Sequence, residues 1–250
     1  RESKFSAVTN LLRTISENID QHDLHALYCF AFRIAPPVAL AGKYAEIPTF
    51  FQCGVEWTES FDSKLEKLTW VPILKSIFRT GMFDETICLT SYLSEQMVEL
   101  GENDPKTIYP IYDSDMFEYG TEVYDYPEEK VILYVGRISP EKGPKRLING
   151  FNRTVGNEQD IGLHFVGDNL EDVGSRAEYA KSIRNMSDDC RNIHYHGWVE
   201  YDELGKYYAG ADVVALPSYT EGFPAVVKEA LSNSTPVVCS DIPAFREIIC

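Results

Sequence analysis

Basic residues are scarce in this sequence relative to acidic ones. Its 250 residues include 23 Lys and Arg against 39 Asp and Glu, which gives a formal net charge of −16. A nucleic-acid-binding protein needs clustered cations to neutralise phosphates, and a broadly basic membrane-binding face needs them as well. We therefore expect no nucleic-acid partner, and only a local cationic patch could support peripheral attachment to a membrane.

Cysteine patterns typical of metal sites are also missing. The six cysteines form no C-x-x-C pair, and none lies beside a histidine at metal-ligand spacing. Cys29, Cys88 and Cys239 lie in apolar strand-like runs, which predicts free core thiols in a reducing compartment. No signal peptide or membrane-length apolar run is visible. The sequence therefore predicts a cytoplasmic location, with the inner membrane surface left open.

Short β-rich apolar runs alternate with longer segments of helical spacing. Strands that alternate with helices predict parallel sheets covered by helices on both faces. The predicted strands are residues 24–28, 49–52, 86–90, 107–111, 131–135, 163–166, 193–196, 213–216 and 237–239. The predicted helices are residues 6–19, 37–44, 64–78, 92–100, 144–155, 176–186, 201–208, 225–231 and 243–249.

An acidic, aromatic stretch without periodicity, residues 116–129, separates two such cycles. We interpret it as an inter-domain seam and divide the chain into residues 1–117, a linker at 118–129, and residues 130–250. No strand precedes the first predicted helix, and the last predicted helix ends the chain. Both domains are therefore expected to be incomplete.

The first motif is V-I-L-Y-V-G-R-I-S-P-E-K-G-P, in which a buried strand runs into Gly136 and a polar loop. Ligands of parallel sheets bind beyond the carboxyl ends of strands. Arg137 and Lys142 lie in this loop, and Pro144 opens the next helix. Two cations beside a helix N-terminus form an anion site suited to a diphosphate. The alternative is a solvated loop with surface cations.

The second motif, A-D-V-V-A-L-P-S-Y-T-E-G-F-P-A-V-V-K-E-A-L, places a turn between a strand and a helix. Gly222 would let a ligand approach the backbone closely. Pro224 has no N–H, so we expect Phe223 and Ala225 to supply the amide donors.

Glu221 and Glu229 flank this turn, eight residues apart. A helix that begins near Glu221 would separate them by about two turns, or ~12 Å. That spacing suits one long ligand contacted at two places, and not two carboxylates acting on one bond. The alternatives are a helix-start acid for Glu221 and an exposed helical residue beside Lys228 for Glu229.

Together with the H-G-W-V segment, these motifs resemble family 4 of the retaining glycosyltransferases. The resemblance is dense over residues 131–249 and looser over residues 22–117. It implies the GT-B fold, with two Rossmann-like parallel-sheet domains that face a cleft. It also implies transfer of a sugar from a nucleoside-diphosphate donor, which is a substrate, with no cofactor and no metal. The implied acceptor is a glycan, a lipid-linked sugar or a small molecule.

The resemblance assigns roles to individual residues. Arg137 and Lys142 match the pair that holds the donor diphosphate, and Gly136 and the amides that follow Glu221 match its backbone cradle. Glu229 matches the acid that binds the ribose hydroxyls, and Glu221 the acid near the transferred sugar. The turn around Trp198 matches a loop near the nucleobase, although the residue pattern slightly favours an ordinary half-buried aromatic for Trp198.

The N-terminal half departs from the family pattern. Members carry a histidine after the strand that we place at 24–28, and His25 is the candidate, with spacing one residue short. The later His-Gly of the family is Cys53-Gly54 here.

Two further patterns suggest metals without specifying a site. Asp113-Ser114-Asp115 is a D-x-D after an apolar run, which in another glycosyltransferase fold binds a divalent ion. His194 and His196 point to one face of a predicted strand, but no third ligand lies nearby in sequence. We therefore interpret both histidines as structural and predict no metal.

Two other functions remain open. A nucleotide-sugar epimerase could share the fold, although no clear acid–base set for it is visible. A non-catalytic nucleotide-sugar-binding module would fit the missing ends and the lost His-Gly. The sequence argues against a dehydrogenase, because no G-x-G-x-x-G follows a predicted strand.

Overall fold

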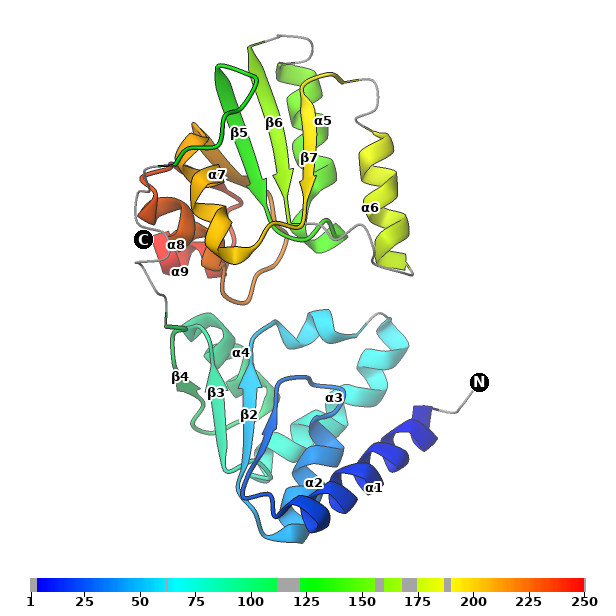
Figure 1. Ribbon diagram of the computed structural model, residues 1–250. Coiled ribbons are helices and arrows are strands. Elements are labelled where there is room, and N and C mark those ends of the chain that lie inside the picture. The colour runs from blue at the N-terminus through cyan, green and yellow to red at the C-terminus, as the bar shows by residue number, and fades with distance from the viewer. Residues whose placement is uncertain are drawn as a thin grey trace. The chain divides into compact units, whose positions relative to one another are not determined.

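The structure, a computed structural model, describes residues 4–61, 63–111, 122–155, 160–167, 175–186 and 190–249 (Figure 1). The chain divides into two compact units, Arg1–Pro110 and Ile111–Cys250. The D-x-D at 113–115 and residues 118–121 of the predicted linker lie outside the described residues. Among the described helices, none is both long and apolar enough to cross a bilayer.

The first unit contains a parallel sheet of four strands in the order β1-β2-β3-β4. Its strands are β1 (Leu27–Cys29), β2 (Thr49–Cys53), β3 (Glu85–Cys88) and β4 (Lys106–Thr107). Its helices are α1 (Lys4–His22), α2 (Ala35–Ala45), α3 (Lys64–Arg79) and α4 (Ser91–Leu100), with the 3₁₀ turn η1 (Trp57–Ser60).

Two strand predictions in this unit were wrong in their bounds. Residues 24–28 were predicted as a strand, but α1 continues to His22 and Asp23 then adopts a positive φ of 50°. The ladder therefore begins only at Leu27. The predicted strand at 107–111 is reduced to Lys106–Thr107, and Pro110 in that run has no N–H for a ladder.

Phenylalanine rings fill the core of the first unit. Phe51 on β2 contacts Phe32, Phe78 and Phe83, with ring centroids 5.0 to 5.3 Å apart. Three cysteines end neighbouring strands of the same core and are free and buried: Cys29, Cys53 and Cys88. The hydrogen bond to Cys88 and burial both raise the pKa of Cys53, so its thiol stays protonated. The prediction of core thiols is therefore confirmed for Cys29 and Cys88.

The second unit contains a parallel sheet of five strands in the order β7-β6-β5-β8-β9. Its strands are β5 (Lys130–Val135), β6 (Ile161–Val166), β7 (Ile193–Gly197), β8 (Val213–Leu216) and β9 (Val237–Cys239). Its helices are α5 (Pro144–Thr154), α6 (Ser175–Asn185), α7 (Leu204–Gly210), α8 (Ala225–Ser232) and α9 (Pro243–Ile249), with the 3₁₀ turns η3 (Pro140–Lys142) and η4 (Tyr201–Glu203).

Alternate residues of β5 enter two different cores. Tyr134 packs with α5 and α6 on one face of the sheet. Leu133 and Val135 pack with α7, α8 and α9 on the other, so the sheet lies between two helical layers (Figure 1). This confirms the parallel, doubly covered sheet that the alternating pattern predicts.

Part of the segment that we assigned to the linker is packed into the second unit. The ring of Tyr124 stacks on Tyr207 of α7 with centroids 4.3 Å apart. The hydroxyl of Tyr126 donates to the backbone carbonyl of Tyr207 at 3.0 Å. The aromatic residues that suggested a seam therefore cover one face of the second sheet, while the exact domain bounds stay a prediction.

Candidate functional site

A cavity of about 190 Å³ lies where β5 and β8 end. These two strands pair in the middle of the sheet, while β6 and β7 extend to one side and β9 to the other. The chain order therefore reverses between β5 and β8, which is where open parallel sheets bind ligands. The lining residues are Tyr134, Val135, Gly136, Lys142, Leu216, Ser218, Glu221, Phe223, Pro224, Ala225 and Val226.

The loops after β5 and β8 hold each other in place. Gly143 has a φ of 70°, and a side chain there would place its Cβ 2.3 Å from the carbonyl oxygen of Pro217. Only glycine fits that approach without moving the backbone. The amide of Tyr219 also donates to the carbonyl of Glu141 at 2.8 Å. The two loops therefore form one wall of the cavity.

An ion pair joins the two sequence motifs inside the cavity. The Nζ of Lys142 lies 2.6 Å from Oε2 of Glu221, and the hydroxyl of Ser218 donates to Oε1 at 2.7 Å. The two charged side chains are only 21% and 9% exposed. Partial burial weakens solvent screening, so both charges act strongly on a ligand beside them. The sequence analysis identified Lys142 and Glu221 as site residues, but it did not predict that they form an ion pair or that Ser218 contacts Glu221.

The start of α8 corrects one prediction. The helix begins at Ala225 and not near Glu221, because Pro224 has φ −79° and ψ 79°. These angles form an inverse γ-turn, in which the Ala225 amide donates to the Phe223 carbonyl at 3.0 Å. The Ala225 amide that we expected to face a ligand is therefore already bonded. The estimate of two helical turns between Glu221 and Glu229 is also wrong, because the helix begins only at Ala225.

Glu229 is buried inside α8, with 4% of its surface exposed. Tyr208 donates to its Oε2 at 2.6 Å and Tyr201 to its Oε1 at 3.4 Å. Burial raises the pKa of Glu229 above its ordinary value, and the two tyrosine hydroxyls offset part of that rise. The alternative of an exposed helical residue is therefore wrong, although Glu229 does not line the cavity.

Three other predicted residues of the second unit lie away from the lining. Arg137 is 55% exposed and its guanidinium lies 3.8 Å from Glu141. Trp198 is 65% exposed, so the alternative of a half-buried aromatic is wrong. Gly222 is buried within the turn that precedes α8.

His25 lies in the first unit, before β1 and not after it. Its side chain is 88% exposed and sits 3.9 Å from Asp23. Ligands of parallel sheets gather at the carboxyl ends of strands, and His25 stands at the amino end. The catalytic role of His25 stays a prediction, and its position at the amino end of β1 argues against that role.

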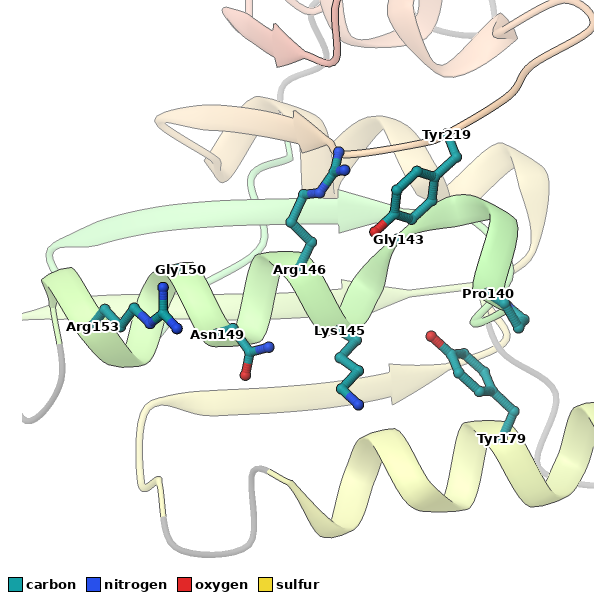
Figure 2. Close-up of a pocket in the computed structure, with 9 residues that line it drawn as sticks. All are labelled: Pro140, Gly143, Lys145, Arg146, Asn149, Gly150, Arg153, Tyr179 and Tyr219. Carbon is teal, nitrogen blue, oxygen red and sulfur yellow. The ribbon is translucent and has the colours of Figure 1, made fainter.

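A larger cavity of about 680 Å³ opens on the outer side of α5. Figure 2 shows its basic wall on α5, formed by Lys145, Arg146 and Arg153, opposite Tyr179 of α6 and Tyr219. The guanidinium of Arg146 lies 4.2 Å from the centre of the Tyr219 ring. Among the described residues, none of the predicted donor residues lines this outer cavity, and no residue lines both cavities.

Residues 122–250, which contain the β5–β8 cavity, match the model of the family "Glycosyl transferases group 1". An uncharacterized glycosyltransferase of Methanocaldococcus jannaschii is 33% identical over 122 residues, or 49% of this chain and 30% of that protein. A D-inositol 3-phosphate glycosyltransferase of Mycobacteroides abscessus is 28% identical over 186 residues, or 68% of this chain and 40% of that protein. The chain thus spans roughly a third of the length of the curated relatives it matches.

Solved structures share the fold. Sucrose-phosphate synthase from Thermosynechococcus elongatus matches all of this chain and 64% of its own, with a TM-score of 0.78 and 18% identity. Anabaena HepE in complex with UDP-glucose matches 97% of this chain and 65% of its own, with a TM-score of 0.74 and 18% identity. These matches confirm the α/β GT-B type of fold. The match of the family model to residues 122–250 shows that the chain belongs to the glycosyl transferases group 1 family.

Proposed function

We propose that the chain carries the donor site of a glycosyltransferase that moves a sugar from a nucleoside diphosphate to an acceptor hydroxyl. The observation that carries this proposal is the Lys142–Glu221 pair inside the cavity at the β5–β8 switch point. A fixed cation and a fixed carboxylate on one wall suit a ligand with an anionic end and a hydroxyl-rich end. A nucleotide sugar is such a ligand.

Lys142 is proposed to bind the diphosphate. In the transfer, the bond between the anomeric carbon and the diphosphate oxygen breaks, and the oxygen keeps the electron pair. Negative charge therefore grows on the diphosphate, and a fixed cation beside it lowers the barrier. Arg137, at the start of the same loop, is proposed as the second cation. These charges support transfer without a metal ion.

Glu221 is proposed to accept hydrogen bonds from the transferred sugar. Lys142 and Ser218 each occupy one of its oxygens, which fixes the direction of the carboxylate. An ionised carboxylate has about four lone-pair sites, so it can accept further bonds from sugar hydroxyls. The carboxylate also stabilises the positive charge that develops at the anomeric carbon.

Glu229 is proposed to bind the ribose hydroxyls. It lies one turn of α8 after Ala225, which lines the cavity. The Tyr208 and Tyr201 hydroxyls orient its carboxylate and leave acceptor sites for two neighbouring hydroxyls. Trp198, on the turn after β7, is proposed to lie near the base.

Retention of the anomeric configuration and membership of family 4 are supported by the motif resemblance. Uridine nucleotides are the first donors to test, because Anabaena HepE, which shares the fold, was solved with UDP-glucose. We propose a glycan, a lipid-linked sugar or a small molecule as acceptor and a cytoplasmic site of action.

Thermal shift with UDP, GDP and UDP-glucose tests the donor assignment. A bound nucleotide stabilises the folded state, and the rise in Tm at a fixed nucleotide concentration grows with the logarithm of its affinity. We expect one nucleotide to raise Tm and its sugar conjugate to be hydrolysed slowly to nucleotide and free sugar. Isomerised donor without free nucleotide would select the epimerase, and binding without turnover would select the non-catalytic module. No shift with any nucleotide would refute the donor site.

A further inference from the structure

Three histidines and one glutamate meet on the α7 face of the second sheet. His164 on β6 is the direct parallel partner of His194 on β7, and His196 follows two residues later. Glu128 reaches them from the segment before β5. Glu128 is 36 residues from His164 and 66 from His194 in the sequence, so no local sequence motif predicts the cluster.

The ligand atoms of this cluster converge. Oε2 of Glu128 lies 2.9 Å from Nε2 of His164, and Oε1 lies 2.7 Å from Nε2 of His194. One such atom from each of the three residues lies within 4.8 Å of the others. His164 and Glu128 have only 1% and 6% of their side chains exposed, whereas His194 keeps 33%. The cluster is thus enclosed on one side and open at His194.

A second layer of contacts fixes the imidazoles. Nδ1 of His164 lies 2.9 Å from Nε2 of His196, and Nδ1 of His196 lies 3.5 Å from the hydroxyl of Tyr124. With a metal bound, Nδ1 of His164 would donate its proton in a hydrogen bond to Nε2 of His196, which leaves the Nε2 lone pair of His164 on the side of Glu128. Such an outer partner is what orients a metal-binding histidine.

Gly162 has no side chain, and the side chains of Glu128 and His164 occupy the space where its Cβ would lie. A Cβ at this position would lie 2.6 Å from the carboxylate of Glu128 and 2.7 Å from Nε2 of His164. Both are ends of side chains and not backbone atoms, so an alanine would displace the ligands while the strand stays in place. The glycine is therefore explained by the cluster.

We propose that Glu128, His164 and His194 bind one divalent first-row transition-metal ion, with Zn²⁺ as the representative, through two Nε2 atoms and one carboxylate. Two imidazoles and one carboxylate form a recognised zinc ligand set, whereas Mg²⁺ prefers oxygen ligands alone. Ligand atoms of a tetrahedral zinc site lie about 3.3 Å apart. The carboxylate oxygens of Glu128, now 2.9 and 2.7 Å from the two Nε2 atoms, would therefore move slightly outward, and the stacked rings of His164 and His194 would tilt toward each other. Water fills the fourth position at the open side.

The charge of the cluster suits a cation. The carboxylate of Glu128 supplies a negative charge, and it lies beside the ring of His164, whose side chain is only 1% exposed.

The ion is expected to be structural. Glu128 stands just before β5 and Gly162 near the start of β6, whereas the donor cavity lies at Gly136, beyond the end of β5. Binding would tie the segment with Tyr124 and Tyr126 to the β6–β7 edge.

Titration of the chelator-treated chain with ZnCl₂, without nucleotide, tests the site. Calorimetry should show one Zn²⁺ per chain, a higher Tm, and no comparable response to Mg²⁺. His194→Ala and Gly162→Ala should each weaken Zn²⁺ binding by at least about tenfold. Both should keep the far-UV circular dichroism of the parent, because one residue is partly exposed and the other displaces only side-chain ends.

His25→Ala is the matched control, since His25 also faces a carboxylate, that of Asp23, but is 88% exposed and outside the cluster. It should bind Zn²⁺ like the parent. No stoichiometric binding, or equal binding by the parent and His194→Ala, would overturn the proposal and leave the cluster as a hydrogen-bond network.

Discussion

The ammonium of Lys142 contacts the carboxylate of Glu221 at 2.6 Å, although 79 residues separate them. The contact joins the loop after β5 to the loop after β8, at the place where the strand order reverses. Because both side chains are largely buried, the pair sets the electrostatics of the cavity. The predictions below follow from this pair and its surroundings.

Lys142→Ala should weaken binding of UDP or GDP about 10–100-fold, because it removes one charge-assisted contact to the diphosphate. Isothermal titration measures the change. Lys145→Ala is the control, since Lys145 lies three residues away but faces the outer cavity. It should change the Kd less than about twofold. Equal loss in both variants would point to general charge, and no loss in Lys142→Ala would refute the phosphate assignment.

Glu221→Gln should separate binding from transfer. Removal of the negative charge frees Lys142, so free nucleotide should bind as well as before or more tightly. Transfer and donor hydrolysis should slow by about 10–100-fold, because one charged contact near the sugar is lost. The two readouts are a nucleotide titration and a steady-state assay of nucleotide release. Unchanged turnover in this variant would remove Glu221 from the sugar site.

Glu229→Gln should remove a pH-dependent cost of folding. Burial raises the pKa of Glu229 above 4.5, so the folded chain holds this proton more tightly than the unfolded chain. The resulting stability is complete below about pH 4.5 and is lost as pH rises through the folded-state pKa. The free energy of unfolding of the parent should therefore fall relative to Glu229→Gln between pH 4.5 and 7. Urea denaturation across that range measures it, and parallel curves would contradict the burial of an ionised acid.

The same Glu229→Gln variant should bind nucleotide more weakly despite its stability. An amide presents one acceptor oxygen where a carboxylate presents two, so a bidentate contact to two ribose hydroxyls is lost. Comparing UDP with the 2′-deoxy form measures this. The difference between the two nucleotides should shrink in the variant, and an unchanged difference would place the ribose elsewhere.

Gly143→Ala should destabilise the second unit and the donor cavity together. Its φ of 70° and the Pro217 carbonyl 2.3 Å from the new Cβ predict a cost of at least about 1–3 kcal/mol. Gly150→Ala is the control, because it lies in α5 with nothing within 4 Å of the added Cβ. That variant should gain about 0.5–1 kcal/mol from helix propensity. Equal effects at both positions would show that the loop contact does not matter.

Local pattern alone determined much of this protein. The alternation of strand-like and helical segments predicted two parallel sheets, and the strands at Val213–Leu216 and Val237–Cys239 were predicted with correct bounds. A buried parallel strand appears in the sequence as a short continuous apolar run, and such a run can be recognised without knowledge of the tertiary structure. The loops after β5 and β8 were singled out for a related reason, since glycine, proline and charged residues follow the strand ends there.

Tertiary structure alone decided how those loops work. The pairing of Lys142 with Glu221 and the burial of Glu229 under Tyr208 depend on contacts between residues tens of positions apart. The turn at Pro224 depends on dihedral angles that no spacing rule fixes. The contact of His194 with Glu128 and its pairing with His164 were not predictable from the sequence, because these partners come from β6 and from the segment before β5. Sequence periodicity predicts which face of the sheet a side chain lies on. Which side chains from different strands lie next to each other on that face depends on the strand order and register, and these are set only in the folded sheet.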